Sequence, residues 1–224
     1  MNDPNEVKAT ISPLYAVPIM HAHVPDAERL NDALRKLFLA MEAEGDRHRD
    51  VQERDNQYRI FESRFHLHRN PAPPVRTLFE FIDSTLKIFV QGMNDYTAEQ
   101  MANIEFDMHS WFHVTRTGGF QGAHSHPNAS WSAIYCVDPG DPGSPYSGAV
   151  RFHDPRSIAD AYRDPGNENL KIPYRLGSWQ LNHKPGQMVV FPSYLVHEIF
   201  PYEGQRPRIV VALNAWARWL RPPL

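Results

Sequence analysis

The chain lacks most of the features that mark secreted, membrane-spanning and nucleic-acid-binding proteins. Its only cysteine is Cys136, so no disulfide can form within the chain. No apolar run approaches the roughly eighteen residues of a membrane-spanning helix. The start of the chain has neither the basic nor the apolar region of a signal peptide. The formal net charge is −3 and there is no run of Lys and Arg, which argues against binding of nucleic acid. We therefore expect a cytoplasmic protein that binds neither membranes nor nucleic acid.

Proline is abundant, with 20 residues in the chain, and it gathers in the second half, where it separates short apolar runs. A length of 224 residues fits one domain with a sizeable core. We expect residues 1–224 to form a single domain. Residues 1–100 would supply an N-terminal strand and buttressing helices, and residues 101–224 the core that carries the functional site.

The first hundred residues contain two amphipathic segments. Residues 11–24 are β-like, and Asp26 is the expected N-cap of a helix in which Leu and Met recur at helical spacing to Met41. A polar stretch follows at 44–56. Pro73-Pro74 then begins a second amphipathic helix that continues to Val90. Both helices are predicted to cover a sheet.

The second half contains eight short apolar runs separated by Gly, Pro, Asn and Asp. Runs of this kind are typical of a jelly roll rather than of alternating α/β units. We predict a mainly β fold, a cupin-like double-stranded β-helix. The long loop 153–173 could cover the mouth of the barrel as a lid. The runs are 104–115, 120–126, 130–137, 148–153, 174–182, 187–191, 196–200 and 207–216.

Histidine pairs of the form His-x-His are candidate metal ligands, because alternate side chains of a strand face the same side. The sequence has three such pairs, at positions 21 and 23, 66 and 68, and 124 and 126. The first lies beside a helix start and the second in a polar connection, so we expect these histidines to be exposed or hydrogen-bonded. His124 and His126 follow Gly118-Gly119 and precede a turn at Pro127-Asn128.

A third ligand and a basic residue lie far downstream of this pair. His197 follows the buried run Met188 to Phe191, and enough chain intervenes for several antiparallel strands to bring it opposite His126. Arg208 opens the next apolar run, where its guanidinium could reach an anion bound at the metal. Arg206 has the same strand parity and is the alternative. We favour Arg208 because it directly precedes the apolar strand.

Five sequence blocks, in this order and spacing, resemble the 2-oxoglutarate and Fe(II)-dependent oxygenases of the prolyl-hydroxylase-like superfamily. They cover about half of the chain, and the opening strand and first helix resemble the same family more weakly. The blocks are His124-Ser-His-Pro-Asn128, Trp131-Ser-Ala-Ile-Tyr-Cys-Val137, Gly148-Ala-Val-Arg-Phe-His-Asp-Pro-Arg156, Phe191-Pro-Ser-Tyr-Leu-Val-His-Glu198 and Arg208-Ile-Val-Val-Ala-Leu-Asn214.

The resemblance implies a non-haem oxidoreductase that uses O₂ and 2-oxoglutarate to hydroxylate an unidentified small molecule or protein. It implies Fe(II) ligation by His124, His126 and His197, and binding of the 2-oxoglutarate carboxylate by Arg208. Imidazole ligands usually donate their other N–H to a fixed acceptor, so neighbouring polar side chains could orient the ligands or contact the oxoacid. The candidates for that supporting role are His113, Ser132 and Asn214.

Two positions depart from the family pattern and leave alternatives open. His126 stands where the superfamily generally has Asp, and Cys136 where relatives tend to carry a Tyr. Three imidazoles can hold Zn(II), or Fe(II) in a dioxygenase that needs no oxoacid. A non-catalytic cupin-like metal protein is a further alternative, in which His113 or Asp107 would close a four-ligand shell. The sequence leaves the oligomeric state open, with a homodimer as one option.

Overall fold

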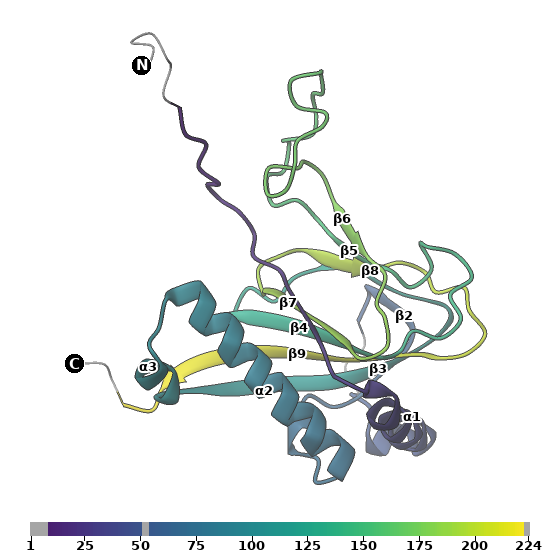
Figure 1. Ribbon diagram of the computed structural model, residues 1–224. Coiled ribbons are helices and arrows are strands. Elements are labelled where there is room, and N and C mark those ends of the chain that lie inside the picture. The colour runs from purple at the N-terminus through teal and green to yellow at the C-terminus, as the bar shows by residue number, and fades with distance from the viewer. Residues whose placement is uncertain (1–8, 51–53, 222–224) are drawn as a thin grey trace, which may run out of the picture.

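The computed structural model describes residues 9–50 and 54–221, and its core is one curled antiparallel sheet of nine strands (Figure 1). The strand order is β1-β7-β4-β9-β3-β8-β5-β6, with β2 paired to β3. The strands are β1 Met20–His23, β2 Gln57–Glu62, β3 Ile104–His124, β4 Trp131–Asp138, β5 Val150–Phe152, β6 Trp179–Leu181, β7 Gln187–Pro192, β8 His197–Ile199 and β9 Arg208–Trp219.

Strand β3 joins the two halves of the barrel. Its first part pairs with β9, and its last residues pair with β8. Gly118 and Gly119 lie where the strand passes from one partner to the other. A Cβ on Gly119 would lie 2.7 Å from the Arg116 carbonyl oxygen, so no larger residue fits this bend. The two layers of strands that result are the predicted double-stranded β-helix, which confirms the fold class.

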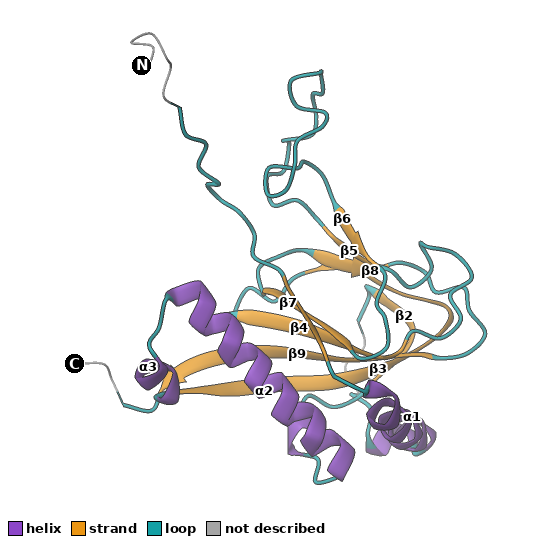
Figure 2. Cartoon of the chain, in the orientation of Figure 1, coloured by secondary structure: helices purple, strands orange, loops and turns teal. Residues whose placement is uncertain are grey.

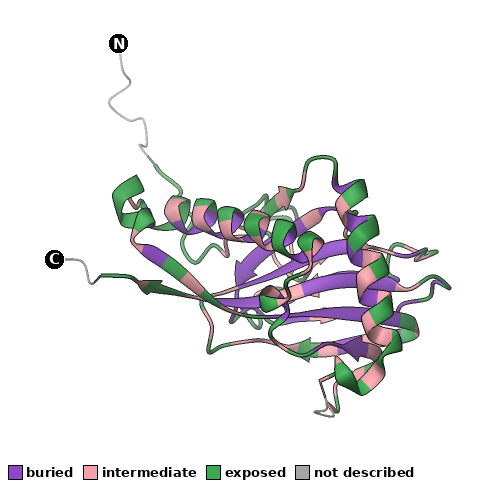
Figure 3. Cartoon of the chain, turned by 90° about the horizontal axis from the view of Figure 1, so that it is seen from below, coloured by how far each residue is buried: buried purple, intermediate pink, exposed green. Residues whose placement is uncertain are grey.

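Two long helices cover the outer face of the larger layer (Figures 2 and 3). They are α1 Ala27–Ala43 and α2 Pro73–Asn94, and α2 begins at the predicted proline pair. Alternate side chains of β4 and β9 face these helices and form the main core with them. Short helical turns η1 Gly45–Arg47 and η2 Leu67–Arg69 flank β2, and α3 Ala98–Ala102 precedes β3.

Asp26 occupies the N-cap position of α1, but its side chain does not cap the helix as predicted. Its backbone is left-handed, with φ 49°, and the side chain makes no cap hydrogen bond. A capping side chain needs an extended backbone to reach the first free N–H groups. A side-chain cap of the kind expected at Asp26 is present at α3, where Thr97 and Gln100 form a reciprocal capping box.

Strand β2 lies just after the stretch that the sequence marked only as polar. It pairs with β3 and places Glu62 directly opposite His113. The segment between β5 and β6 projects from the barrel and includes the loop predicted as a lid (Figure 1). Among the described residues, no helix is long and apolar enough to cross a membrane. The division of the chain at residue 100 stays a prediction.

The stacked pair Phe38 and Phe112 offers a test of how the helices hold the sheet. Both side chains are fully buried, and their rings lie 4.3 Å apart and nearly parallel. Phe38→Ala should lower the free energy of unfolding by roughly 3–5 kcal/mol, because it leaves a cavity between α1 and β3. Urea unfolding measures this loss. The exposed Ile88→Ala should stay within about 0.5 kcal/mol of wild type, and equal losses would contradict the packing described.

Candidate metal centre

The chain brings its third histidine pair and His197 together at one end of the barrel. His124 ends β3 and pairs directly with His197, the first residue of β8. His126 follows in the turn, where its backbone N–H donates to the Ser193 carbonyl at 2.8 Å. That bond fixes the turn on the connection between β7 and β8. The three side chains therefore come from two neighbouring strands and one pinned turn.

The geometry of the three rings suits a single metal ion. Each offers a nitrogen, and these nitrogens all lie within 4.8 Å of one another. The Nδ1–H of His124 donates to the Gly122 carbonyl at 2.8 Å, and that of His197 donates to the Leu195 carbonyl at 2.9 Å. Two backbone carbonyls thus hold these two rings with Nε2 as the acceptor nitrogen, and Nε2 of His124 also lies 3.2 Å from the Gln121 amide nitrogen.

The three imidazoles are neutral around pH 7. Burial lowers the pKa of His126 to about 4 and that of His197 to about 3, and the charge of His124 would lower both further. Burial also lowers the pKa of His124. A metal needs the deprotonated form of each ligand, so binding here displaces no proton at neutral pH.

His113 lies behind the triad and is held by other groups. Its Nε2 is 2.7 Å from a Glu62 carboxylate oxygen, and the indole N–H of Trp111 points at the same nitrogen. Asp107 is exposed and pairs with Arg218 at 3.1 Å. In the described part of the chain neither side chain is free to complete a closed four-ligand shell.

The buried Glu62 forms an ion pair with the half-buried Arg54 beside His113, which the sequence did not reveal. Arg54 Nε lies 3.0 Å from one carboxylate oxygen, and Gln57 donates to the other. Burial opposes ionisation of Glu62, but the hydrogen bonds of His113 and Gln57 and the nearby charges outweigh it and lower the pKa to about 2. The available signal was the alternation of 57–62, which indicates a strand.

Ser132 and Asn214 form a buried polar chain near the triad. They face each other on β4 and β9, and the Ser132 hydroxyl donates to the Asn214 side-chain oxygen at 2.7 Å. The Ser193 hydroxyl lies 2.8 Å from the same oxygen of Ser132. These hydrogen bonds therefore link the barrel wall to the segment that holds His126, which suits the supporting role predicted for Ser132 and Asn214.

Arg208 lies inside the barrel at the start of β9, whereas Arg206 lies outside. The Arg208 side chain is buried, and its Nη2 has no hydrogen-bond partner among the described residues. Burial lowers its pKa, although an arginine still stays charged. Arg206 is largely exposed and donates to the Gly140 carbonyl. The structure thus separates the two candidates by position.

A narrow cavity leads from the triad along the inner face of the barrel. Its wall includes Ile134, Phe191, Val210 and Ala212. Val210 and Ala212 have the same strand parity as Arg208, so all three side chains face the interior. Arg208 thus lies on the same side of β9 as the part of the cavity wall that Val210 and Ala212 form.

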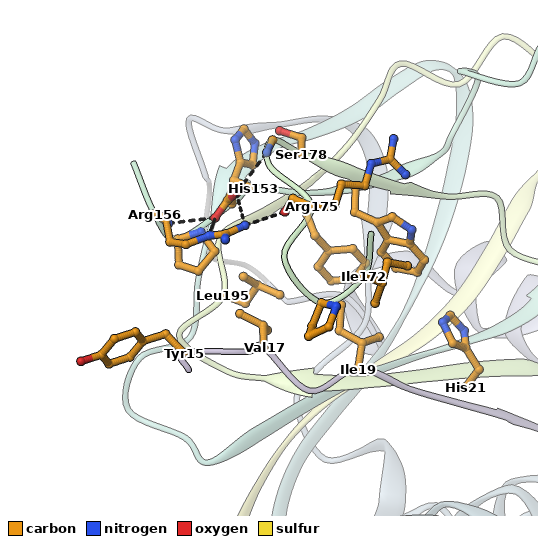
Figure 4. Close-up of a pocket in the computed structure, with 16 residues that line it drawn as sticks. Tyr15, Val17, Ile19, His21, His153, Arg156, Ile172, Arg175, Ser178 and Leu195 are labelled. Atoms are coloured by element: carbon orange, nitrogen blue, oxygen red, sulfur yellow. Dashed lines mark hydrogen bonds and ion pairs between the residues drawn. The ribbon is translucent and has the colours of Figure 1, made fainter. Parts of the chain in front are cut away.

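A larger cavity of about 300 Å³ opens at the edge of the barrel (Figure 4). Its floor is apolar and includes Val17, Ile19 and Leu195, with Ile172 on the projecting segment. Arg175 lies on the rim. The Leu195 carbonyl is the acceptor that orients His197, so this cavity and the triad share a wall.

The other histidine pairs lie apart from the triad. His21 Nδ1 lies 3.3 Å from the Gln187 amide, and His23 is on the same edge strand, β1. His68 Nδ1 lies 2.8 Å from the Ser110 hydroxyl. Among the described residues, the triad is the one cluster of histidine, cysteine and acidic side chains whose geometry could hold a metal ion.

The sequence comparisons identify the class of protein. Residues 109–214, nearly half of the chain, match the model of a family described as "Putative 2OG-Fe(II) oxygenase". No curated protein sequence matches the chain. The site thus belongs to a non-haem iron oxidoreductase whose cofactors are Fe(II) and 2-oxoglutarate. Over residues 109–214 the chain is similar to the 2-oxoglutarate and Fe(II)-dependent oxygenases.

Solved structures of such oxygenases share the fold. A prolyl-4-hydroxylase from Pseudomonas putida is 18% identical, with a TM-score of 0.61 over 89% of this chain and 92% of that one. A prolyl hydroxylase from Trichoplax adhaerens, in complex with a hypoxia inducible factor peptide fragment, is 12% identical, with a TM-score of 0.61 over 91% and 84%. HygX from Streptomyces hygroscopicus, with nickel, 2-oxoglutarate and hygromycin B bound, is 10% identical, with a TM-score of 0.56 over 90% and 83%. At these identities the likeness establishes the fold alone.

The buried Glu62 carboxylate should make stability depend on pH. Its pKa is depressed on folding, so its contribution is present above the unfolded value near 4.5 and is lost as pH falls toward 2. Glu62→Gln should cost roughly 1–3 kcal/mol of unfolding free energy at pH 7. That cost should shrink by about 1 kcal/mol at pH 4, because wild type has begun to lose the contribution.

Urea unfolding at both pH values measures the two differences. The histidines of the triad affect wild type and variant alike, so only the difference between the two proteins reports on Glu62. Glu168→Gln, at an exposed site, should change neither value. A cost that is the same at pH 7 and pH 4 would contradict the ionised state of Glu62.

Proposed function

We propose that His124, His126 and His197 hold Fe(II) and that Arg208 binds the distal carboxylate of 2-oxoglutarate in an oxygenase that hydroxylates its substrate. The observation that carries this assignment is the unpartnered, buried Nη2 of Arg208, inside the same barrel as three neutral imidazoles. A buried cation without a partner is costly, so the site is built for an anion. A dicarboxylate that also chelates the metal satisfies both ends.

Each group of residues has a defined task in this proposal. With O₂ as the oxidant, bound Fe(II) would couple oxidative decarboxylation of 2-oxoglutarate to hydroxylation, so that one oxygen atom enters succinate, with release of CO₂, and the other enters the substrate. The Arg208 guanidinium orients the oxoacid through charge-assisted hydrogen bonds. Ile134, Phe191 and Val210 line the cavity near the triad and keep water from the reacting groups. The three imidazoles would hold Fe(II) through three protein nitrogens, which leaves co-substrate and O₂ to supply further ligands.

The two rival interpretations fit these contacts less well. A three-His dioxygenase without an oxoacid has no use for a buried guanidinium at the end of β9. A non-catalytic protein would be expected to close its metal shell, but His113 is held by Glu62 and Asp107 by Arg218. His126 in place of an aspartate therefore changes the charge of the ligand set without removing the anion site.

The cavity at the barrel edge is the proposed substrate site. It adjoins the triad through Leu195, and the projecting segment between β5 and β6 supplies part of its wall (Figure 4). Its apolar floor and the rim guanidinium of Arg175 suit a small molecule with an apolar body and an acidic group. The cytoplasmic location and the oligomeric state stay predictions.

A spectroscopic titration tests the metal and co-substrate assignment. Under anaerobic conditions, Fe(II) and 2-oxoglutarate should give a metal-to-ligand charge-transfer band in wild type. His197→Ala should abolish the band, and His21→Ala should keep it. Arg208→Met should weaken 2-oxoglutarate binding by roughly a hundredfold, because a charged hydrogen-bond pair is lost. Arg206→Met, at the exposed position, is its matched control.

The outcomes separate the competing functions. A wild-type protein that binds Fe(II) but gives no band and forms no succinate would favour a dioxygenase that needs no oxoacid. Retention of Zn(II) without oxygen consumption would favour the non-catalytic alternative. Equal effects of the two arginine variants would contradict the assignment of Arg208.

The substrate site predicts a variant that separates substrate use from basal turnover. A small-molecule extract should stimulate succinate formation by wild type with Fe(II) and 2-oxoglutarate. Ile172→Asp, at an exposed position of the cavity wall, should lose most of this stimulation and keep the unstimulated rate, since it places a charge on an apolar surface. Ile88→Asp on the outer face of α2 is the control. Full stimulation of the Ile172 variant would place the substrate elsewhere.

A further inference from the structure

His183 lies in the connection from β6 to β7, at the end of the barrel that contains Arg208. Leu181 pairs with Val150 in the β5–β6 ladder, and both side chains belong to the barrel interior. His183 follows Leu181 by two residues, just beyond the end of this ladder, and it lies close enough to Arg208 for the guanidinium charge to act on its ring. The Gly186 N–H donates to the Cys136 carbonyl at 2.9 Å, which ties the connection to the end of β4.

Gly148 is in contact with the Arg208 side chain. A Cβ at this position would lie 2.9 Å from Arg208 Cδ and 3.3 Å from Nε, and the residue has φ 63°. Any larger residue would therefore be strained and would displace the guanidinium stem. The missing side chain leaves room for the stem of Arg208.

Both residues carry buried polar atoms without a partner. Neither ring nitrogen of His183 has a hydrogen-bond partner among the described residues, and the same holds for Arg208 Nη2. An unsatisfied buried donor or acceptor costs about 1–3 kcal/mol. Two such groups at the same end of one barrel indicate that they share a partner.

We propose that His183 and Arg208 together form the binding site for the distal carboxylate of 2-oxoglutarate, in which His183 donates a ring N–H to one oxygen while Arg208 pairs with the carboxylate. This inference rests on the proposed function and adds a second co-substrate-binding residue to it. His183 comes from a connection outside the sequence blocks that carry the family resemblance.

The charge state of His183 suits this role. Burial and the nearby charge of Arg208 lower its pKa to about 3, so the ring is neutral when the carboxylate binds. A neutral donor adds a directed hydrogen bond without a second buried positive charge. Arg208 supplies the charge, and His183 fixes the position of one oxygen.

Two substitutions at His183 test the donor role. His183→Leu removes both nitrogens, and His183→Gln keeps an N–H donor in a side chain of similar reach. The readouts are the dissociation constant of 2-oxoglutarate from the Fe(II) protein, taken from the charge-transfer band, and the melting temperature of the metal-free protein. His109→Leu, at an exposed histidine on β3, is the matched control.

The Leu variant should bind 2-oxoglutarate about tenfold more weakly or worse, and the Gln variant should stay within about threefold of wild type. The melting temperature of the metal-free Leu variant should not fall, because the change removes unsatisfied polar atoms. Binding of pyruvate, a 2-oxoacid without a second carboxylate, should be the same in all four proteins.

The failure of this inference can be distinguished from failure of the proposed function. If wild type forms the band and the Leu variant binds 2-oxoglutarate equally well, the assignment of His183 is wrong and the function stands. A lower melting temperature with unchanged affinity would make His183 a structural residue and would also overturn the assignment. A wild-type protein without a band would overturn both proposals.

Discussion

An unpaired positive charge inside the barrel is the constraint on which the rest of the site depends. Arg208 is buried with Nη2 unsatisfied, and its stem occupies the space that Gly148 leaves free. Such a charge is tolerable only if an anion completes it during function. The three imidazoles are neutral, which is consistent with this constraint because protonated ligands would add to the buried positive charge. Arg208 is thus a buried cation whose Nη2 lacks a partner among the described residues, which suits an anionic ligand.

Strand alternation connects this site to the stability of the fold. On β9, Arg208 and Val210 face the cavity, while Ile209 and Val211 pack with the helices. On β4 the same rule sends Tyr135 outward, where its hydroxyl donates to Asn31 of α1 at 2.7 Å. A shift of one residue in the β4–β9 register would therefore empty the core and bury the wrong side chains at the metal. The helices position the site by fixing that register.

The sequence allowed the prediction of the residues whose chemistry is local or whose strand parity is readable. The spacing of His124 and His126 indicated a shared ligand face, although His126 lies in the turn after β3 rather than on the strand. The preference for Arg208 over Arg206 followed from the apolar run after it. Glu62 could not be predicted, because its role depends on a pairing with His113 across two strands. His183 was missed for a related reason: Arg208, whose charge acts on it, is distant in sequence. Long-range contacts, rather than composition, decide both positions.

His126 in place of an aspartate has a consequence for the whole charge balance. Fe(II) and doubly ionised 2-oxoglutarate cancel each other, so an anionic ligand would also cancel the charge of Arg208, whereas three imidazoles leave that charge in the barrel. The Glu62 carboxylate does not offset the charge of Arg208, because Arg54 Nε lies 3.0 Å from that carboxylate and already balances its charge. A second cation at the distal carboxylate would raise the uncompensated charge further. A neutral histidine at position 183 instead strengthens binding of the carboxylate through a hydrogen bond alone, which is the solution that a three-histidine site requires.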